Sequence, residues 1–236
     1  MSENIKKITK AFVVDLDSSK NQSILKPNTR PFNNQAHQVN EVAKKIAEKI
    51  YKLIKDAKHS NDGIILNHNK IKEAFFSPFK PQLKDAQVFL SHSHADKNKA
   101  LKVKNYLEED LDAECVFIDS LFWDYKDNIM KEMSKYDDTS KIEDAFTLIL
   151  RESLQDMIEK CPYFVFLQSN NSVSNQGLSH ITYSAWIYEE LKIAHSIRES
   201  RPTPMMESWQ AFHDISPFLE NLETITLKEL SQQINS

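Results

Sequence analysis

The sequence has almost no glycine: Gly63 and Gly177 are the only two in 236 residues. Phosphate-binding loops of the GxGxxG and GxxxxGK[ST] types need glycine, because their backbone must approach the phosphate closely. A dinucleotide-binding fingerprint and a P-loop are therefore both missing. Any nucleotide site in this chain must be built in another way.

Cysteine and long apolar runs are also scarce. Cys115 and Cys161 are the only cysteines and do not form a CxxC pair, so we expect neither a disulfide framework nor a thiolate zinc site, which favours a reducing compartment. No apolar run approaches the roughly 20 residues of a membrane-spanning helix. The first residues, Met1 to Asn4, lack the apolar core of a signal peptide. We therefore expect a cytoplasmic protein that does not bind membranes.

Neither sign of charge dominates the composition. The formal net charge is -4 at pH 7, which gives no overall basic surface for nucleic acid or anionic lipid. The hydrophobic fraction of 40% and the charged fraction of 27% are typical of a folded globular protein. The lysine-rich stretch between Lys44 and Lys58 is interpreted as a solvated helix face rather than a nucleic-acid site.

The pattern of apolar residues changes near residue 82. Residues 1–82 form a predicted N-terminal extension, with a short strand, a polar linker and an amphipathic helix. Residues 83–236 form a predicted second domain in which strands and helices alternate, which is typical of a parallel sheet covered by helices on both faces. The predicted strands are 11–16, 86–91, 114–119, 163–168 and 224–226; the predicted linker is 17–34; the predicted helices are 35–58, 70–76, 96–110, 141–159, one around Trp186, and 227–234.

One carboxylate in the Trp186 helix lies where an apolar residue is expected. At about 100° per residue, the helix has a continuous apolar arc with Glu190 in its middle, whereas Glu189 falls outside it. An unpartnered charge on a buried face is costly. Glu190 is therefore paired with a basic neighbour, protonated, or directed into a polar cavity where it has a function. The arc consists of Trp186, Ile187, Leu191, Ile193, Ala194 and Ile197.

Ligands of open α/β sheets bind beyond the carboxyl ends of the strands, and three segments in and near such positions resemble the conserved boxes of TIR domains. Val88 to Asp96 reads VFLSHSHAD, an apolar strand ending in serine and followed by an aspartate. Phe117 to Ser120 is similar to the second strand, and Ser184 to Leu191 resembles the SxW-xxx-EL box. The resemblance covers roughly residues 85 to 200. It is closest to bacterial TIR proteins of anti-phage defence, including the signal-producing TIR protein of Thoeris systems.

The resemblance implies a flavodoxin-like fold and a specific activity. Enzymatic TIR domains cleave the nicotinamide glycosidic bond of NAD and release ADP-ribose or a cyclised or transferred product that acts as a signal. NAD is then the substrate, no cofactor is expected, and the partners implied are further copies of the chain on activation and a downstream effector. The catalytic glutamate of the family corresponds to Glu190, whose carboxylate can stabilise the cationic ribose formed as nicotinamide leaves. Substrate-binding residues expected on the same basis are Ser91, His92, Asp119, Trp123, Tyr125 and Trp186.

The chain departs from the family after the second strand, where many signalling TIR domains carry an Arg-Asp-x-x-Pro-Gly loop. Here Ser120 to Tyr125 reads SLFWDY, so the geometry of that loop is not carried over. We interpret the segment as a loop whose aromatic residues stack on a ring of the substrate, anchor the loop, or contact a partner. For Trp186, the alternative to substrate binding is a role in packing.

Three other functions compete with the NAD-processing one. A TIR-like fold also serves as a non-enzymatic module that acts by self-association. His92 to Asp96 contains HxHxD, the first part of the metal-binding motif of metallo-β-lactamases, which would make the chain a metal-dependent hydrolase. Lys97 stands where that motif has its next histidine, so no metal is expected. Val13 to Asp17 resembles the DxD start of haloacid-dehalogenase-type phosphatases, but Ser18 and Ser19 replace the usual Gly-Thr.

Overall fold

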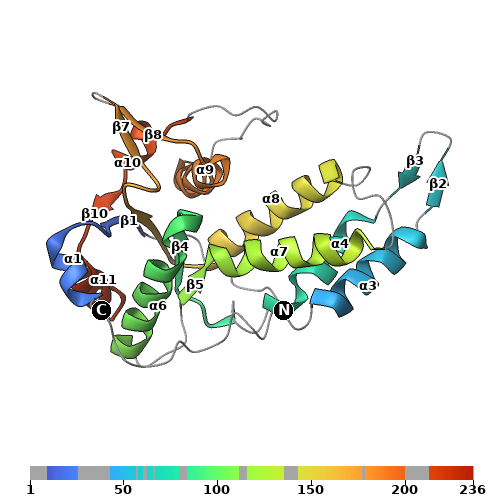
Figure 1. Ribbon diagram of the computed structural model, residues 1–236, viewed down its shortest axis with the longest axis horizontal. Helices are drawn as coiled ribbons and strands as arrows, with labels where there is room; N and C mark the ends of the chain where they lie inside the picture. The colour runs from blue at the N-terminus through green and yellow to red at the C-terminus, as the bar shows by residue number, and fades with distance from the viewer. Residues whose placement is uncertain are drawn as a thin grey trace. The chain divides into compact units, whose positions relative to one another are not determined.

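The computed structural model describes residues 10–25, 43–56, 58–60, 63–65, 67–79, 84–111, 116–135, 143–176, 179–199 and 213–235 (Figure 1). The chain divides into two compact units, and each is assembled from segments that are distant in sequence. Unit 1 contains Met1–Phe32, Asp85–Ser120 and Met157–Ser236. Unit 2 contains Asn33–Lys84 and Leu121–Asp156.

Unit 1 is an α/β structure built on a five-stranded sheet in which every paired strand is parallel. The strands lie in the order β10-β1-β6-β4-β5. Apolar, mostly buried residues dominate four of them, β1, β4, β5 and β6, as is usual for parallel sheets covered on both faces, whereas both residues of β10 are polar and exposed. The strands are β1 (Lys10–Asp15), β4 (Val88–His92), β5 (Val116–Ile118), β6 (Tyr163–Gln168) and β10 (Glu223–Thr224).

The centre of the sheet forms the core of unit 1. Phe89 of β4 stacks on Phe164 of β6 and on Phe117 of β5, each with a ring-centroid separation of 5.9 Å. All three rings are buried. In the register of the sheet, Ser91 lies opposite Phe166, so the polar carboxyl end of β4 is next to an apolar strand.

The strand order becomes that of a flavodoxin-like fold when β1 is moved in sequence. Counted from β4, with β1 taken after β6, the order is 2-1-3-4-5, which is a common doubly wound order. The N-terminal strand β1 fills the fourth position between β6 and β10. The sheet therefore has a permuted order relative to that fold.

Helices pack on both sides of β4 (Figure 1). One side carries α6 (Lys97–Leu111), which also packs on β5 and on α11 (Leu227–Ile234), and the other carries α9 (Ala185–Glu199). Side chains of α6 fix the start of β5, because Lys104 Nζ donates to the carbonyl oxygen of Val116 at 2.9 Å and Glu108 accepts its N–H at 3.1 Å. The short helix α1 (Ser19–Ile24) joins β1 to α11, since Asn21 bonds the backbone of both Asp15 and Leu227.

A second, three-stranded antiparallel sheet adjoins α9. It contains β7 (Ser174–Gln176), β8 (Ser179–Thr182) and β9 (His213–Asp214). The short helix α10 (Ser216–Leu219) packs on both β8 and α9. Its Phe218 ring meets the ring of Tyr188 on α9 at a centroid separation of 5.5 Å. One further short helix, η2 (His94–Asp96), follows β4.

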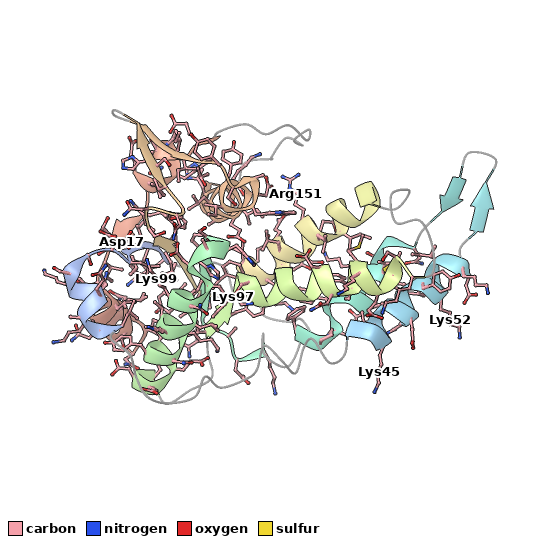
Figure 2. The ribbon with its side chains drawn as sticks, viewed as in Figure 1. Asp17, Lys45, Lys52, Lys97, Lys99 and Arg151 are labelled. Atoms are coloured by element: carbon pink, nitrogen blue, oxygen red, sulfur yellow. The ribbon has the colours of Figure 1, made fainter. Side chains whose placement is uncertain are left out.

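Unit 2 is mainly helical. The apolar side of α3, with Ala47, Ile50 and Ile54, is buried, and α3 packs on α4. Lys45 and Lys52 lie on the exposed side of α3 (Figure 2). Lys72 of α4 pairs with Asp156 of α8 at 2.8 Å. The elements are α3 (Ala43–Lys55), a hairpin of β2 (Lys58–Ser60) and β3 (Gly63–Ile65), α4 (His68–Phe76), η1 (Ser77–Phe79), and all but the ends of α7 (Asp119–Met133) and α8 (Glu143–Lys160).

The predicted α/β class with a parallel sheet is confirmed, but the units do not follow the predicted boundary near residue 82. The predicted N-terminal extension contributes β1 to the middle of the sheet, because its buried apolar residues pair with β6 along their whole length. Residues 121–156, predicted to lie within the second domain, belong to unit 2 together with α3 and α4. Part of the predicted linker, 19–24, is helix α1.

Candidate functional site

Two residues that the sequence analysis selected are in direct contact. Ser91 Oγ, near the carboxyl end of β4, donates to Glu190 Oε2 of α9 at 2.5 Å. The two residues are 99 positions apart in the chain, and both have 0% exposed surface. A buried carboxylate that receives a hydroxyl hydrogen bond lies where α9 crosses the sheet.

The burial of Glu190 follows from the way α9 begins and packs. Ser184 Oγ accepts the backbone N–H of Ile187 at 3.2 Å, an N-capping contact that starts the helix. The predicted apolar arc is confirmed for Ile187, Leu191, Ile193 and Ala194, which are buried around Glu190. The helix therefore presents the carboxylate to the sheet together with its apolar residues.

Glu189, which falls outside the predicted apolar arc, is also buried. Glu189 is only 6% exposed. The reason is that α9 packs on β4 along one side and on β8 and α10 along another, so more than one face is covered. Glu189 and Glu190 are thus two buried carboxylates on the same helical turn.

His92 and Trp186 lie close to Ser91 and Glu190 in sequence but differ in placement. His92 follows Ser91 on β4, and the alternation of side chains along a strand directs it to the other face of the sheet. His92 Nδ1 donates to the carbonyl oxygen of Ser93 at 2.6 Å. Trp186 is partly buried one helical turn before Glu190.

Trp123 and Tyr125 are not in a loop, so that prediction is wrong, and Asp119, predicted to end a strand, is in a helix. Helix α7 begins at Asp119, directly after β5, and its backbone runs through both aromatic positions. No helix-breaking glycine or proline interrupts Asp119 to Met133, so the chain turns from strand to helix at once. The side chains of these three residues lie outside the described part of the structure.

A second group of polar residues lies at the carboxyl ends of the strands, and the sequence analysis named only Asp96 among them. Asp96, buried in η2 after β4, accepts hydrogen bonds from Ser169 Oγ and, at 2.9 Å, from Asn171 Nδ2. Both donors belong to the turn that follows β6. Asp96 therefore ties that turn to the segment that begins with Ser91, and a polar residue directly after an apolar strand was the available sequence signal.

An ion pair extends this group to the turn after β1. Lys99 Nζ lies 3.0 Å from Asp17 Oδ1 and 3.4 Å from Asp96 Oδ1, and Figure 2 shows Lys99 and Asp17 close together. The hydrogen bond from the Asn170 N–H, with a smaller effect of Lys99, holds the pKa of Asp17 below its ordinary value against the opposing effect of burial. Burial lowers the pKa of Lys99, but the hydrogen bond and the attraction of the two carboxylates together outweigh it and raise that pKa.

The HxHxD segment does not form a metal site. His92 is bound to Ser93 and Asp96 to Ser169 and Asn171. Within the described ranges, no three side chains of the His, Cys, Asp or Glu type come together as metal ligands. The geometry therefore gives no support to the metal-dependent hydrolase alternative.

None of the helices in the described part of the chain combines the length and the apolar character needed to span a membrane. Comparison of the chain with protein-family models, with curated proteins and with solved structures found no match.

Proposed function

We propose that the chain is a TIR-type NAD-processing enzyme in which Glu190 acts on the nicotinamide ribose. The observation that carries the proposal is the 2.5 Å hydrogen bond between Ser91 and Glu190. These residues come from the first and third TIR-like boxes, which were selected separately. The parallel sheet, with its order of 2-1-3-4-5 once β1 is permuted, supports the same assignment.

The proposed reaction breaks the bond between C1′ of the ribose and the nicotinamide nitrogen. The bonding electrons leave with nicotinamide, which becomes neutral, and positive charge develops on the ribose as an oxocarbenium ion. A carboxylate beside the sugar stabilises this charge, and low-dielectric surroundings strengthen the effect. Ser91 holds one oxygen of Glu190 and thereby orients the carboxylate.

The second half of the reaction decides the product. Attack of water on C1′ yields ADP-ribose, and attack by an atom of the adenosine part yields a cyclic product. We propose that this product is a cytoplasmic signal for a downstream effector in bacterial anti-phage defence, and that self-association of the chain activates its synthesis. In this conformation Glu190 has no exposed surface, so access of NAD requires the elements around it to separate, and activation would be the step that separates them.

The test is release of nicotinamide from NAD, followed by chromatography, by the wild type and by two variants. Glu190→Gln keeps the size of the side chain but removes the charge, and we expect a loss of activity of at least about 100-fold if the carboxylate carries about 2.7 kcal/mol of transition-state stabilisation. Glu189→Gln is the matched control, because it changes a second buried carboxylate on the same turn; its activity should stay within a few fold of wild type.

The test includes conditions that would activate the protein. The assay is run on the resting protein, under crowding conditions and in lysate of phage-infected cells, because the closed site requires opening. Activity that survives in Glu190→Gln, or no nicotinamide release under any of the three conditions, would overturn the proposal. In the second case self-association measured by light scattering would point to the non-enzymatic alternative.

A further inference from the structure

We propose that Asp96 keeps the site closed, and that loss of its hydrogen bonds to the turn after β6 lets α9 separate from β4 and uncovers Glu190. This inference rests on the proposed function, which requires such an opening because Glu190 has no exposed surface. The turn after β6 is the point at which the chain leaves the parallel sheet and enters the elements that carry Glu190. Control of that turn would therefore be control of access to the carboxylate.

The elements between β6 and β10 in sequence pack on one another. Strand β8 pairs with β7 and β9 and packs on α9 and α10, and α10 also packs on α9. Figure 1 shows β7, β8 and α10 grouped beside α9. We call these five elements the α9 layer, whose described residues are 174–176, 179–199 and 213–219. The layer belongs to unit 1, as does the parallel sheet.

The end of β4 holds the α9 layer in two ways. Helix α9 packs on β4, where Ser91 donates to Glu190. Asp96, five residues after Ser91, binds residues 169 and 171 of the turn that leads into β7. The layer is thus fixed both where the chain enters it and at its helix. Release of the turn would leave the contact between α9 and β4 to resist opening without this support.

The hydrogen bonds of Asp96 are of the strong kind. Its carboxylate is 1% exposed and accepts from Ser169 Oγ and, at 2.9 Å, from Asn171 Nδ2. Hydrogen bonds to a carboxylate are stronger than those between neutral groups, and burial strengthens them further. In contrast, β7, β8 and β9 have only two to four residues each, and so short a sheet contributes little stability of its own. Much of the resistance to opening is therefore concentrated at Asp96.

A second carboxylate binds the same turn from the side of β1. The N–H of Asn170 donates to Asp17 Oδ2 at 2.9 Å. Lys99 Nζ lies 3.0 Å from Asp17 and 3.4 Å from Asp96, and Figure 2 shows Lys99 beside Asp17. These contacts join the turns that follow β1, β4 and β6, which are neighbours in the sheet. The turn is consequently held from both adjacent strands.

The test removes one hydrogen bond of Asp96 with Asn171→Ala. Asn171 is exposed, so the substitution leaves no cavity. A hydrogen bond to a charged group favours the closed state by about tenfold to a hundredfold. We expect the backbone amides of β8 and α9 in the resting protein to exchange with deuterium faster by this factor, measured by mass spectrometry, and those of β1, β6 and α6 to be unchanged. Nicotinamide release by the resting protein should rise by the same factor, because a larger fraction of molecules is open.

Asn221→Ala is the matched control. Asn221 is also exposed, and its Nδ2 also donates at 2.9 Å, but to the backbone carbonyl oxygen of Pro217. This variant should keep the exchange of α9 and the nicotinamide release of the wild type. Ser169→Ala removes the other hydrogen bond to Asp96 and should reproduce the effect of Asn171→Ala.

Three outcomes would overturn the inference. The first is unchanged exchange of α9 in both Asn171→Ala and Ser169→Ala. The second is faster exchange spread evenly over unit 1, which would show a general loss of stability. The third is faster exchange of α9 without more nicotinamide release by the resting protein, although the same variant is active under crowding or in lysate.

Failure of the proposed function is seen separately. In that case no condition gives nicotinamide release, or Glu190→Gln retains it. Faster exchange of α9 in Asn171→Ala would then still show that Asp96 controls the separation of α9 from β4, and only the reaction with NAD would be withdrawn.

Discussion

The hydrogen bond between Ser91 and Glu190 predicts a measurable coupling between their substitutions. Both residues have no exposed surface and their oxygens are 2.5 Å apart. A hydrogen bond to an ionised group contributes about 1.5–3 kcal/mol, and one between neutral groups about 0.5–1.5 kcal/mol. Ser91→Ala should therefore lower the free energy of unfolding by about 1.5–3 kcal/mol when Glu190 is present as a carboxylate.

The same serine substitution should cost less in a Glu190→Gln background. The amide oxygen of glutamine can still accept from Ser91, but the bond is then neutral and worth about 0.5–1.5 kcal/mol. The difference between the two backgrounds, about 1–1.5 kcal/mol, is the coupling free energy of a double-mutant cycle. It measures how much of the contact depends on the charge of Glu190.

Urea denaturation of the wild type, the two single variants and the double variant gives this coupling. Fluorescence and far-UV circular dichroism must report the same transition, because the chain has two compact units. The slopes must also agree among the four proteins. A coupling below about 0.3 kcal/mol, the usual error of additivity, would refute the view that Ser91 supports a charged Glu190.

Two further predictions concern ionised groups outside this contact. The hydrogen bond from Asn170 holds the pKa of Asp17 below its ordinary value, so the wild type should lose stability as the pH falls below about 3.9, the usual aspartate pKa. Thermal unfolding from pH 2 to 7 measures this loss, and the melting temperature of Asp17→Asn should depend less on pH in that range. Parallel curves of melting temperature against pH would contradict this. Lys104→Met should destabilise by about 3–5 kcal/mol in urea, because it leaves the largely buried Glu108 without its cation. Lys135→Met, at an exposed ion pair, should cost less than about 1 kcal/mol, and equal costs for the two lysines would refute the role of burial.

The elements that the sequence predicted best are those with a local signal. Strand β6 and helix α11 have the predicted limits, 163–168 and 227–234. The strand is a continuous apolar run, and the helix begins at a capping box in which Thr226 and Glu229 bond each other's backbone. Such signals are contained within a few residues and do not depend on the rest of the fold.

The arrangement of the elements was less predictable because it depends on distant partners. Strand β1 was predicted as a strand, but its place between β6 and β10 depends on segments about 150 and 210 residues further along the chain. Nothing in residues 10–15 indicates that pairing. The strand was therefore assigned to an extension, although it belongs to the middle of the sheet.

The candidate site was predicted in part. The helical period selected Glu190 and the resemblance selected Ser91, and the structure places the two side chains in contact in the interior, while their roles stay predictions. The period did not indicate that Glu189 is buried as well, which follows from the contacts of α9 with both β4 and the β8–α10 region.

The distribution of buried polar groups is the strongest physical argument for a functional site. Ser91, Asp96, Ser120 and Ser169 all lie at or just beyond the carboxyl ends of the parallel strands, and Glu190 reaches the same edge from α9. Apolar residues of similar volume would often be as stable or more stable at such positions, because each polar group loses its hydration. The hydrogen bonds of Asp96 hold the turn after β6, but they offset only part of this cost. Since ligands of doubly wound sheets bind at this edge, the cost is borne where binding and catalysis can use it, as local departures from stable packing generally are.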